Sequence, residues 1–477
     1  MHAKRFHPTF LRAAVALALL ASAAYAGGPY LPTTESLRTH KAPLWFEDAK
    51  FGVFIHWGVY AVPAFHEWYV DFISPKANFG FMFGGPPFTA TQGNFPDDLF
   101  KRLIREEAYK YHLANWGPNF AYDDFIPMFK AEKFAPDDWA ELFRQSGAKY
   151  VVLTAKHGDE YALWPTRHTH RNSMETGPHR DLAGDLAQAV RKQGLKMGFY
   201  HNTTYTFWDQ RFPGRDWVDY MNNSIKELVD LYHPSIIWGD VTVGPVYGHG
   251  GKPLPADYWN SKDVLAYFYN HSPEPAEVVA NDRWGLDGDG THLGDFITPE
   301  RTRRNHILKD KWETCDSMDP DSWGYNRRLK PGEYMTPNEL VDYLVDVVSK
   351  NGNLMINIGP RADGTIPEIM QECLRQTGQW LRVNGEAIYG SRCWENFRDG
   401  DVRFTRKGNT LYAIALEWPE DALKLTSLAG KDVLGVEMLG LHEPVKWSQQ
   451  SDGLVIQPPA RRPCRYAYTF KIVCRSL

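Results

Sequence analysis

Short apolar runs recur along the first 360 residues, and each of them ends in polar or titratable side chains. Apolar strands whose carboxyl ends all carry such groups are what a (β/α)8 barrel presents to a substrate. The pattern therefore predicts a barrel with a site at these strand ends. The runs at 51–58, 150–157, 196–201, 234–240 and 277–283 carry, in this order, His56, His157, Tyr200 with His201, Trp238 with Asp240, and Arg283.

Helical patterns alternate with these runs. Residues 136–143 open with a proline and two aspartates, residues 180–196 place apolar positions on one face, and Thr336 with Glu339 forms a capping box. A strand at 353–359 follows that last helix, and another helix is expected over 367–383. Alternation of this kind favours a parallel sheet with crossover helices, here with about seven recognisable strands. The expected fold class is a (β/α)8-like barrel.

Two stretches depart from this alternation. Residues 59–135 are long, rich in Gly, Pro and aromatic residues, and poorly periodic, which is typical of either a rim over the site or a peripheral insertion. Beyond about residue 394, apolar and polar positions alternate around an Asp452-Gly453 turn, which predicts an antiparallel β-sandwich. We therefore expect a catalytic barrel over 27–393 and a C-terminal β-sandwich domain over 394–477.

The N-terminus has the pattern of a secretory signal. Three basic residues precede an apolar run, and Ala24-Tyr25-Ala26 fits a cleavage site. The run is too short to span a bilayer, so we expect cleavage after Ala26 and a secreted or periplasmic protein without a membrane anchor; a retained anchor is the alternative. Cleavage would change the formal net charge from −5 to −8, since the three basic residues leave with the signal. An acidic protein has no electrostatic reason to bind nucleic acid.

The five cysteines all lie in the C-terminal part of the chain. Cys464 and Cys474 are close enough in sequence to form a disulfide in an oxidising compartment, and the odd count leaves at least one thiol unpaired. No C-x-x-C spacing occurs, which argues against a structural zinc site.

Asp240 is the most informative residue, because a carboxylate at the end of a buried strand is unfavourable unless chemistry requires it. Glycoside hydrolysis requires two carboxyl groups, one at the anomeric carbon and one that protonates the leaving oxygen. Asp240 fits the first role, and a nearby Arg283 would favour its ionised form. The alternative is an aspartate that only anchors a loop.

Two residues compete for the second role. Glu300 lies in an expected loop, from which a side chain can reach the substituent outside the pocket, whereas Glu313 begins an expected strand and would contact the sugar ring. We favour Glu300 and keep Glu313 as the alternative acid/base. For a retaining enzyme, the two carboxyl groups should lie about 5–5.5 Å apart.

The strand-end histidines allow a metal-site interpretation. Against it, no H-x-H or H-E-x-x-H spacing joins His56, His157 and His201, and tryptophans lie between them in sequence. Uncharged donors beside aromatic rings suit hydroxyl recognition better, so we expect no metal and no cofactor. Any one of the three, His201 above all, is alternatively a core residue.

Several segments together resemble the α-L-fucosidases of glycoside hydrolase family 29. They follow one another in family order over most of residues 40–395. They are WFEDAKFGVFIHWG at 45–58, HEWY at 66–69, GPHRDL at 177–182, NDRWG at 281–285, SWGYN at 322–326, NGNLMINIGP at 351–360 and NGEAIY at 384–389.

The resemblance implies an exo-acting, retaining α-L-fucosidase that works through a covalent fucosyl-enzyme on terminal fucose of oligosaccharides or glycoconjugates. It implies Asp240 as the nucleophile and Glu300 as the acid/base. It also implies a fucose pocket, to which we add His201 as a strand-end donor. The implied pocket residues are His56, Glu67, Trp68, His157, Tyr200, Trp238, Arg283 and Trp323.

Two positions differ from the family pattern. Gly158 stands where a second histidine usually follows His157, and Val241 replaces the usual glycine after the nucleophile. Both bear on the identity of the sugar. The alternatives are therefore a related α-L-glycosidase, such as an α-L-galactosidase, and a lectin-like fucose-binding protein without activity. The sequence leaves oligomeric state open, a homo-oligomer included.

Overall fold

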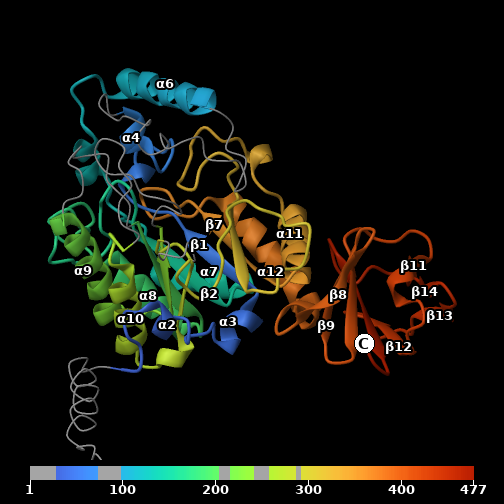
Figure 1. The fold of residues 1–477 in the computed structure, drawn as a ribbon. Coiled ribbons are helices and arrows are strands. Elements are labelled where there is room, and N and C mark those ends of the chain that lie inside the picture. Colours follow the sequence, from blue (N-terminus) through green and yellow to red (C-terminus); the bar gives the residue numbers. More distant parts are fainter. Residues whose placement is uncertain (1–27, 74–97, 203–214, 241–256, 286–291) are drawn as a thin grey trace, which may run out of the picture.

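The computed structural model describes residues 28–73, 98–202, 215–240, 257–285 and 292–477 (Figure 1). The predicted signal at 1–26 and Val241 lie outside the described residues. None of the described helices is both long and apolar enough to cross a membrane.

A parallel sheet of seven strands forms the centre of the larger domain. Its order is β5-β4-β3-β2-β1-β7-β6, and every neighbouring pair is parallel. The strands are β1 (Phe51–Ile55), β2 (Tyr150–Lys156), β3 (Lys196–His201), β4 (Ile236–Gly239), β5 (Val279–Ala280), β6 (Trp312–Ser317) and β7 (Gly352–Ile358).

Residues 295–301 close this sheet into a barrel. On one side, the amide of Asp295 donates at 2.8 Å to the carbonyl of Ala280, the last residue of β5. On the other side, Ile297 donates to Lys311 at 3.0 Å and Arg301 donates to Cys315 at 2.9 Å, next to and within β6. The segment thus occupies the eighth position of the ring, and the predicted (β/α)8-like barrel is confirmed.

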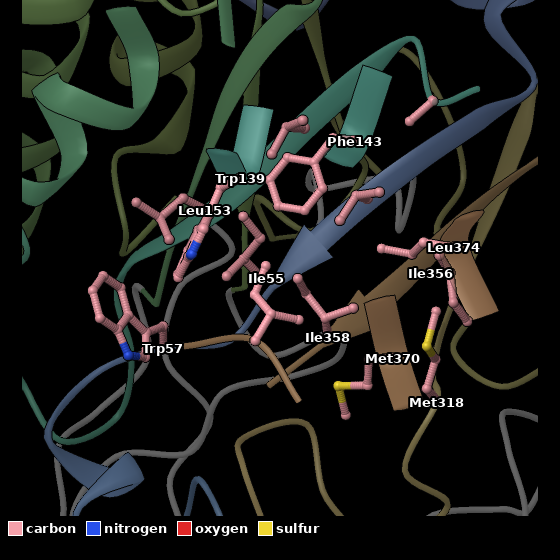
Figure 2. Close-up of a cluster of buried hydrophobic side chains, with 14 of the residues drawn as sticks. Ile55, Trp57, Trp139, Phe143, Leu153, Met318, Ile356, Ile358, Met370 and Leu374 are labelled. Atoms are coloured by element: carbon pink, nitrogen blue, oxygen red, sulfur yellow. The ribbon is translucent and has the colours of Figure 1, made fainter. Parts of the chain in front are cut away.

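Side chains alternate between the two faces of the barrel strands, as pleating requires. Phe54, Tyr200, Trp238 and Met355 pack together inside the ring. Residues of the opposite parity, such as Ile55, Leu153 and Ile356, face the surrounding helices, where they meet Phe143 and Leu374 (Figure 2).

Helices follow the strands and cover the barrel (Figure 1). Thr336 caps α11, with its hydroxyl accepting from the Glu339 amide and the Glu339 carboxylate accepting in return, so the predicted capping box is confirmed. The helices are α2 (Thr34–Leu37), α3 (Leu44–Ala49), α4 (Tyr69–Ile73), α6 (Asp98–Asn115), α7 (Pro136–Gln145), α8 (Leu182–Lys192), α9 (Arg215–Tyr232), α10 (Ser261–His271), α11 (Pro337–Ser349) and α12 (Glu368–Ile388).

The C-terminal part is a β-sandwich with its own apolar core, as predicted. A five-stranded antiparallel sheet packs against a three-stranded sheet, and one apolar cluster contains residues of both. The strand orders are β12-β15-β10-β9-β8 and β11-β14-β13. The strands are β8 (Arg392–Asp399), β9 (Val402–Lys407), β10 (Thr410–Ala415), β11 (Leu423–Leu425), β12 (Val433–Met438), β13 (Lys446–Gln450), β14 (Gly453–Gln457) and β15 (Tyr468–Cys474). All five cysteines are unpaired, Cys464 and Cys474 included.

The sandwich is attached to the barrel beside α11 and α12 (Figure 1). Asp346 on α11 lies at this junction: its carboxylate accepts from Lys350 Nζ at 2.5 Å and from Arg403 Nε on β9 at 2.8 Å. The indole of Trp380 on α12 donates to the carbonyl of Ala467 at 2.7 Å. These polar contacts are buried or nearly so, and they fix the orientation of the second domain.

Replacement of Asp346 by alanine is expected to lower the free energy of unfolding by about 2–3 kcal/mol, because it leaves the side chain of Lys350, 4% exposed, without its carboxylate. Urea denaturation measures this change. Glu420→Ala removes a carboxylate that is 78% exposed and is expected to change the value by less than about 0.5 kcal/mol. Equal effects of the two substitutions would contradict the role of Asp346.

Candidate active site

Asp240 directly follows β4, at the carboxyl end of the barrel. Its carboxylate accepts from the Tyr200 hydroxyl at 2.8 Å and from Arg283 Nη1 at 3.0 Å. The side chain is 29% exposed, so it is accessible from the barrel mouth. The strand therefore presents a held, outward-accessible carboxylate.

Glu300 meets Asp240 at the same guanidinium nitrogen. Arg283 Nη1 forms hydrogen bonds with both carboxylates, and Glu300 is also 29% exposed. The remaining donors of Arg283 bind Thr298, at 3.1 Å to its hydroxyl and 2.7 Å to its carbonyl. The guanidinium carbon lies 4.7 Å from the centre of the Trp238 ring. Two carboxylates are thus brought together across one immobilised cation.

Opposing influences act on Asp240. Burial raises its pKa above the ordinary value, Arg283 lowers it, neighbouring Glu300 raises it, and the hydrogen bond from Tyr200 lowers it again; the net direction is upward. Burial, together with the Asp240 charge, also raises the pKa of Tyr200 well above its ordinary value. Tyr200 therefore remains a hydrogen-bond donor over the whole physiological pH range.

His56 and His157 form a buried, uncharged wall beside this pair. Burial lowers the pKa of His56 to about 4 and that of His157 to about 3. The His157 ring stacks on Tyr200 with centroids 5.8 Å apart, and His56 lies 5.2 Å from the Trp323 ring. Within the described residues, Nδ1 of His157 has no hydrogen-bond partner. Neutral imidazoles of this kind suit contact with sugar hydroxyls.

Glu67 connects two loops at the barrel mouth. Its carboxylate accepts from the Ser322 hydroxyl at 3.0 Å and from the backbone amides of Trp323 and Gly324 at 2.9 and 3.3 Å. Burial opposes ionisation, but His66, His157 and His56 lower the pKa of Glu67 to about 2. Part of the 59–135 stretch thus borders the site, as a rim would.

Trp68 follows Glu67 and completes this side of the site. Its ring stands edge-on to His157, with centroids 4.7 Å apart. Of the residues that the sequence predicted, the structure thus brings together His56, Glu67, Trp68, His157, Tyr200, Trp238, Asp240, Arg283, Glu300 and Trp323.

His201 does not belong to this group. Its Nε2 lies 2.9 Å from the hydroxyl of Ser224 on α9, and its ring is next to Trp164. Tyr200 and His201 are adjacent in β3, so their side chains point to opposite faces. Since Tyr200 faces the site, His201 faces the helices, and the prediction that it binds substrate is not supported.

Glu313 is deeper in the barrel than expected of an acid/base. It is 1% exposed and accepts hydrogen bonds from the Tyr150 hydroxyl and, at 3.4 Å, from the Trp238 indole. Burial raises its pKa to about 7. It lies in the N-terminal half of β6, whereas the site is at the carboxyl ends, so it supports Trp238 from below.

Asn357 is a site residue that the sequence analysis did not single out. Its side chain contacts His56 Nδ1 at 2.7 Å, the Trp323 carbonyl at 2.7 Å and the Ser317 hydroxyl at 3.0 Å. A polar residue between Ile356 and Ile358 in an apolar strand is the signal that could have revealed it. Among the described residues, no group of three or more His, Cys, Asp or Glu side chains is arranged to hold a metal ion.

Comparison with known proteins agrees with this geometry. A family model described as "Alpha-L-fucosidase" matches residues 17–386, and "Alpha-L-fucosidase C-terminal domain" matches residues 395–473. The chain belongs to the α-L-fucosidase family. It is 37% identical to the tissue alpha-L-fucosidase of Rattus norvegicus, with 96% of each chain covered. The human tissue alpha-L-fucosidase is also 37% identical, over 93% of this chain and 91% of that one.

Solved structures of α-L-fucosidases share the fold. The Thermotoga maritima alpha-fucosidase in complex with fucose superimposes with a TM-score of 0.75 and 34% identity, covering 93% of this chain and all of the other. The same enzyme with a mechanism-based inhibitor gives a TM-score of 0.76 at 35% identity. Both architecture and domain order are therefore those of the family.

Glu313 gives this fucosidase-family barrel a pH-dependent stability. In the unfolded chain its carboxyl releases a proton near its ordinary value of 4.5, whereas the folded protein retains it up to about 7. The free energy of unfolding therefore falls, through this group, as pH rises from 4.5 to 7 and is constant above. Relative to Glu313→Gln, the wild type is expected to lose about 2–3 kcal/mol over this interval.

Urea denaturation of both proteins at pH 4.5, 6 and 8 measures that difference. Effects of other groups cancel because both proteins share them. Glu420→Gln, at a side chain 78% exposed, serves as the control and should follow the wild type. A constant difference between wild type and Glu313→Gln would contradict the burial effect.

Proposed function

We propose that the protein is an exo-acting α-L-fucosidase that hydrolyses terminal α-L-fucosyl residues with retention, with Asp240 as nucleophile and Glu300 as acid/base. The single observation that carries the proposal is the convergence of both carboxylates on Arg283. Retaining glycosidases need a pair of carboxyl groups about 5–5.5 Å apart, and a shared hydrogen bond to one guanidinium nitrogen supports such a pair because it brings the two groups close together.

In the first step, the Asp240 carboxylate attacks the anomeric carbon while protonated Glu300 gives its proton to the departing glycosidic oxygen. The carbon–oxygen bond breaks, and a fucosyl ester of Asp240 forms. Arg283 and the Tyr200 hydroxyl hold Asp240 for attack. As the ester forms, the negative charge on Asp240 disappears and one appears on Glu300, so the cation of Arg283 stabilises charge on either side of the step.

In the second step, Glu300 takes a proton from a water molecule that attacks the same carbon. The ester bond breaks, L-fucose leaves with its original configuration, and both carboxyl groups return to their starting states. The sugar is bound by the neutral imidazoles of His56 and His157 and by the rings of Trp68 and Trp323, which line the mouth. His56 itself is held by Asn357.

The substrate class and the location of the protein are supported by its relatives and by its N-terminal sequence. Relatives that cover nearly the whole chain are named alpha-L-fucosidases, which supports fucosylated oligosaccharides or glycoconjugates as substrates. Together with the signal pattern at 1–26, this supports export from the cell. A lectin-like protein would have no use for two carboxylates paired on one arginine, and an α-L-galactosidase is distinguished by a panel of aryl α-L-glycosides.

Removal of the nucleophile tests the first role. Asp240→Gly is expected to lower kcat on an aryl α-L-fucoside by at least about 1,000-fold, because no ester can form. Added azide should restore release of the aryl group and yield a β-fucosyl azide, identified by mass spectrometry and NMR. Near wild-type turnover in Asp240→Gly would refute the assignment of Asp240.

Comparison of Glu300→Ala with Glu313→Gln tests the second role. On an aryl fucoside with a good leaving group, Glu300→Ala should form the intermediate at a near-normal rate and hydrolyse it about 100-fold or more slowly, since activation of water is lost. Stopped-flow measurement should then show a burst of aryl release. Glu313→Gln should show no burst; a burst there and not in Glu300→Ala would reverse the assignment.

A further inference from the structure

Gly158 lies immediately after His157, at the carboxyl end of β2, where the space for a side chain is already filled. A Cβ atom on Gly158 would lie 2.5 Å from Cζ3 of Trp68 and 3.2 Å from both Cε3 and Cη2. Real Cβ atoms do not approach other heavy atoms more closely than 3.0 Å. The indole of Trp68 thus occupies the volume that any side chain at position 158 would need.

The backbone conformation at position 158 does not require a glycine. Gly158 is outside the left-handed region of positive φ, in contrast to Gly177 and Gly364, which have φ of 60° and 91°. A residue with a side chain is therefore compatible with the conformation at position 158. What excludes a side chain there is the contact with Trp68.

The backbone of Trp68 is held in place by hydrogen bonds. Its amide donates to His66 Nδ1 at 3.2 Å, and its carbonyl accepts from the amides of Asp71 and Phe72 at 3.0 and 3.2 Å. Its ring is partly buried, and on one side it meets His157 edge-on at 4.7 Å. A side chain at position 158 would force the indole to turn away from His157, because the backbone of Trp68 is fixed.

We propose that Gly158 is a positioning and specificity-determining residue, whose missing side chain lets the Trp68 indole form the pocket wall beside His157. This rests on the proposed function, since the pocket is the sugar site. The atoms that fill the position of a side chain at residue 158 are indole carbons, Cε3, Cζ3 and Cη2, and not hydrogen-bonding groups. The wall therefore favours an apolar part of the sugar, as a deoxy sugar offers, over an additional hydroxyl.

Adding a polar side chain at position 158 is expected to weaken sugar binding. Gly158→His adds a hydrogen-bond donor next to His157, yet it should weaken sugar binding because the imidazole displaces the indole. Gly158→Ala, which adds one methyl group, should lower kcat/KM on an aryl α-L-fucoside about tenfold, mainly through KM, and weaken binding of L-fucose by a similar factor. Steady-state kinetics and calorimetric titration with L-fucose measure these changes.

A double-mutant cycle separates positioning from a general structural effect. Trp68→Ala should itself bind L-fucose more weakly, but addition of Gly158→Ala to it should change KM and Kd by less than about twofold, because the clashing ring is gone. Gly332→Ala is the matched control, since its Cβ would meet no atom within 4 Å. It should behave like the wild type in melting temperature and kinetics.

Several results would overturn the inference. They are an equal effect of Gly158→Ala in both backgrounds, wild-type KM in Gly158→Ala, and a higher kcat/KM in Gly158→His. Should Gly158→Ala not fold, the double variant decides: folding and L-fucose binding like Trp68→Ala support the inference, and failure to fold contradicts it. A wild type that binds L-fucose but does not cleave the fucoside would contradict only the proposed function, because the cycle can be read from binding.

Discussion

The site depends on one cation that makes two neighbouring carboxylates tolerable. Asp240 and Glu300 would repel each other if placed side by side in a partly dry pocket, and burial alone raises the pKa of Asp240. Arg283 opposes both effects by binding the two carboxylates, and it is itself fixed by two hydrogen bonds to Thr298 and by the Trp238 ring. Because the guanidinium cannot move away, the distance between the carboxylates is fixed by the protein before any sugar is present.

Residues around this ion cluster are also held in place by polar contacts. Glu67 fixes the loop that carries Trp323, Asn357 fixes His56, and Glu313 supports Trp238 from inside the barrel. Trp323, His56 and Trp238 are thus each held by a second polar group behind them. Such support allows hydrogen bonds and rings to be oriented in advance, which reduces the entropy lost when a substrate binds.

Much of this arrangement could be predicted from the sequence, because the apolar strands and the groups at their ends follow directly from its pattern. Asp240, Arg283 and His157 were found in this way. His201 was proposed as a strand-end donor with a core residue as the alternative, and its contacts with Ser224 and Trp164 agree with the alternative, because side chains in a strand alternate. Glu313 was kept as an alternative acid/base although it begins its strand, and the beginning of a barrel strand lies away from the carboxyl ends that form the site. Trp68 contacts the Cβ position of Gly158, which is 90 positions away in the chain, and a local sequence pattern cannot predict such a contact.

The irregular closing segment at 295–301 has a consequence for how this type of enzyme can change. Asp240 extends from a regular strand, so any shift of its position would disrupt a ladder of hydrogen bonds with β3 and β5. Glu300 instead comes from a stretch joined to its neighbours by a few separate bridges. A change in the length of this segment would alter the reach of Glu300, the proposed proton donor, without breaking the ladder between β3, β4 and β5. The proposed nucleophile is thus fixed by a regular strand, whereas the position of the proposed acid/base is set by a segment outside the regular ladder.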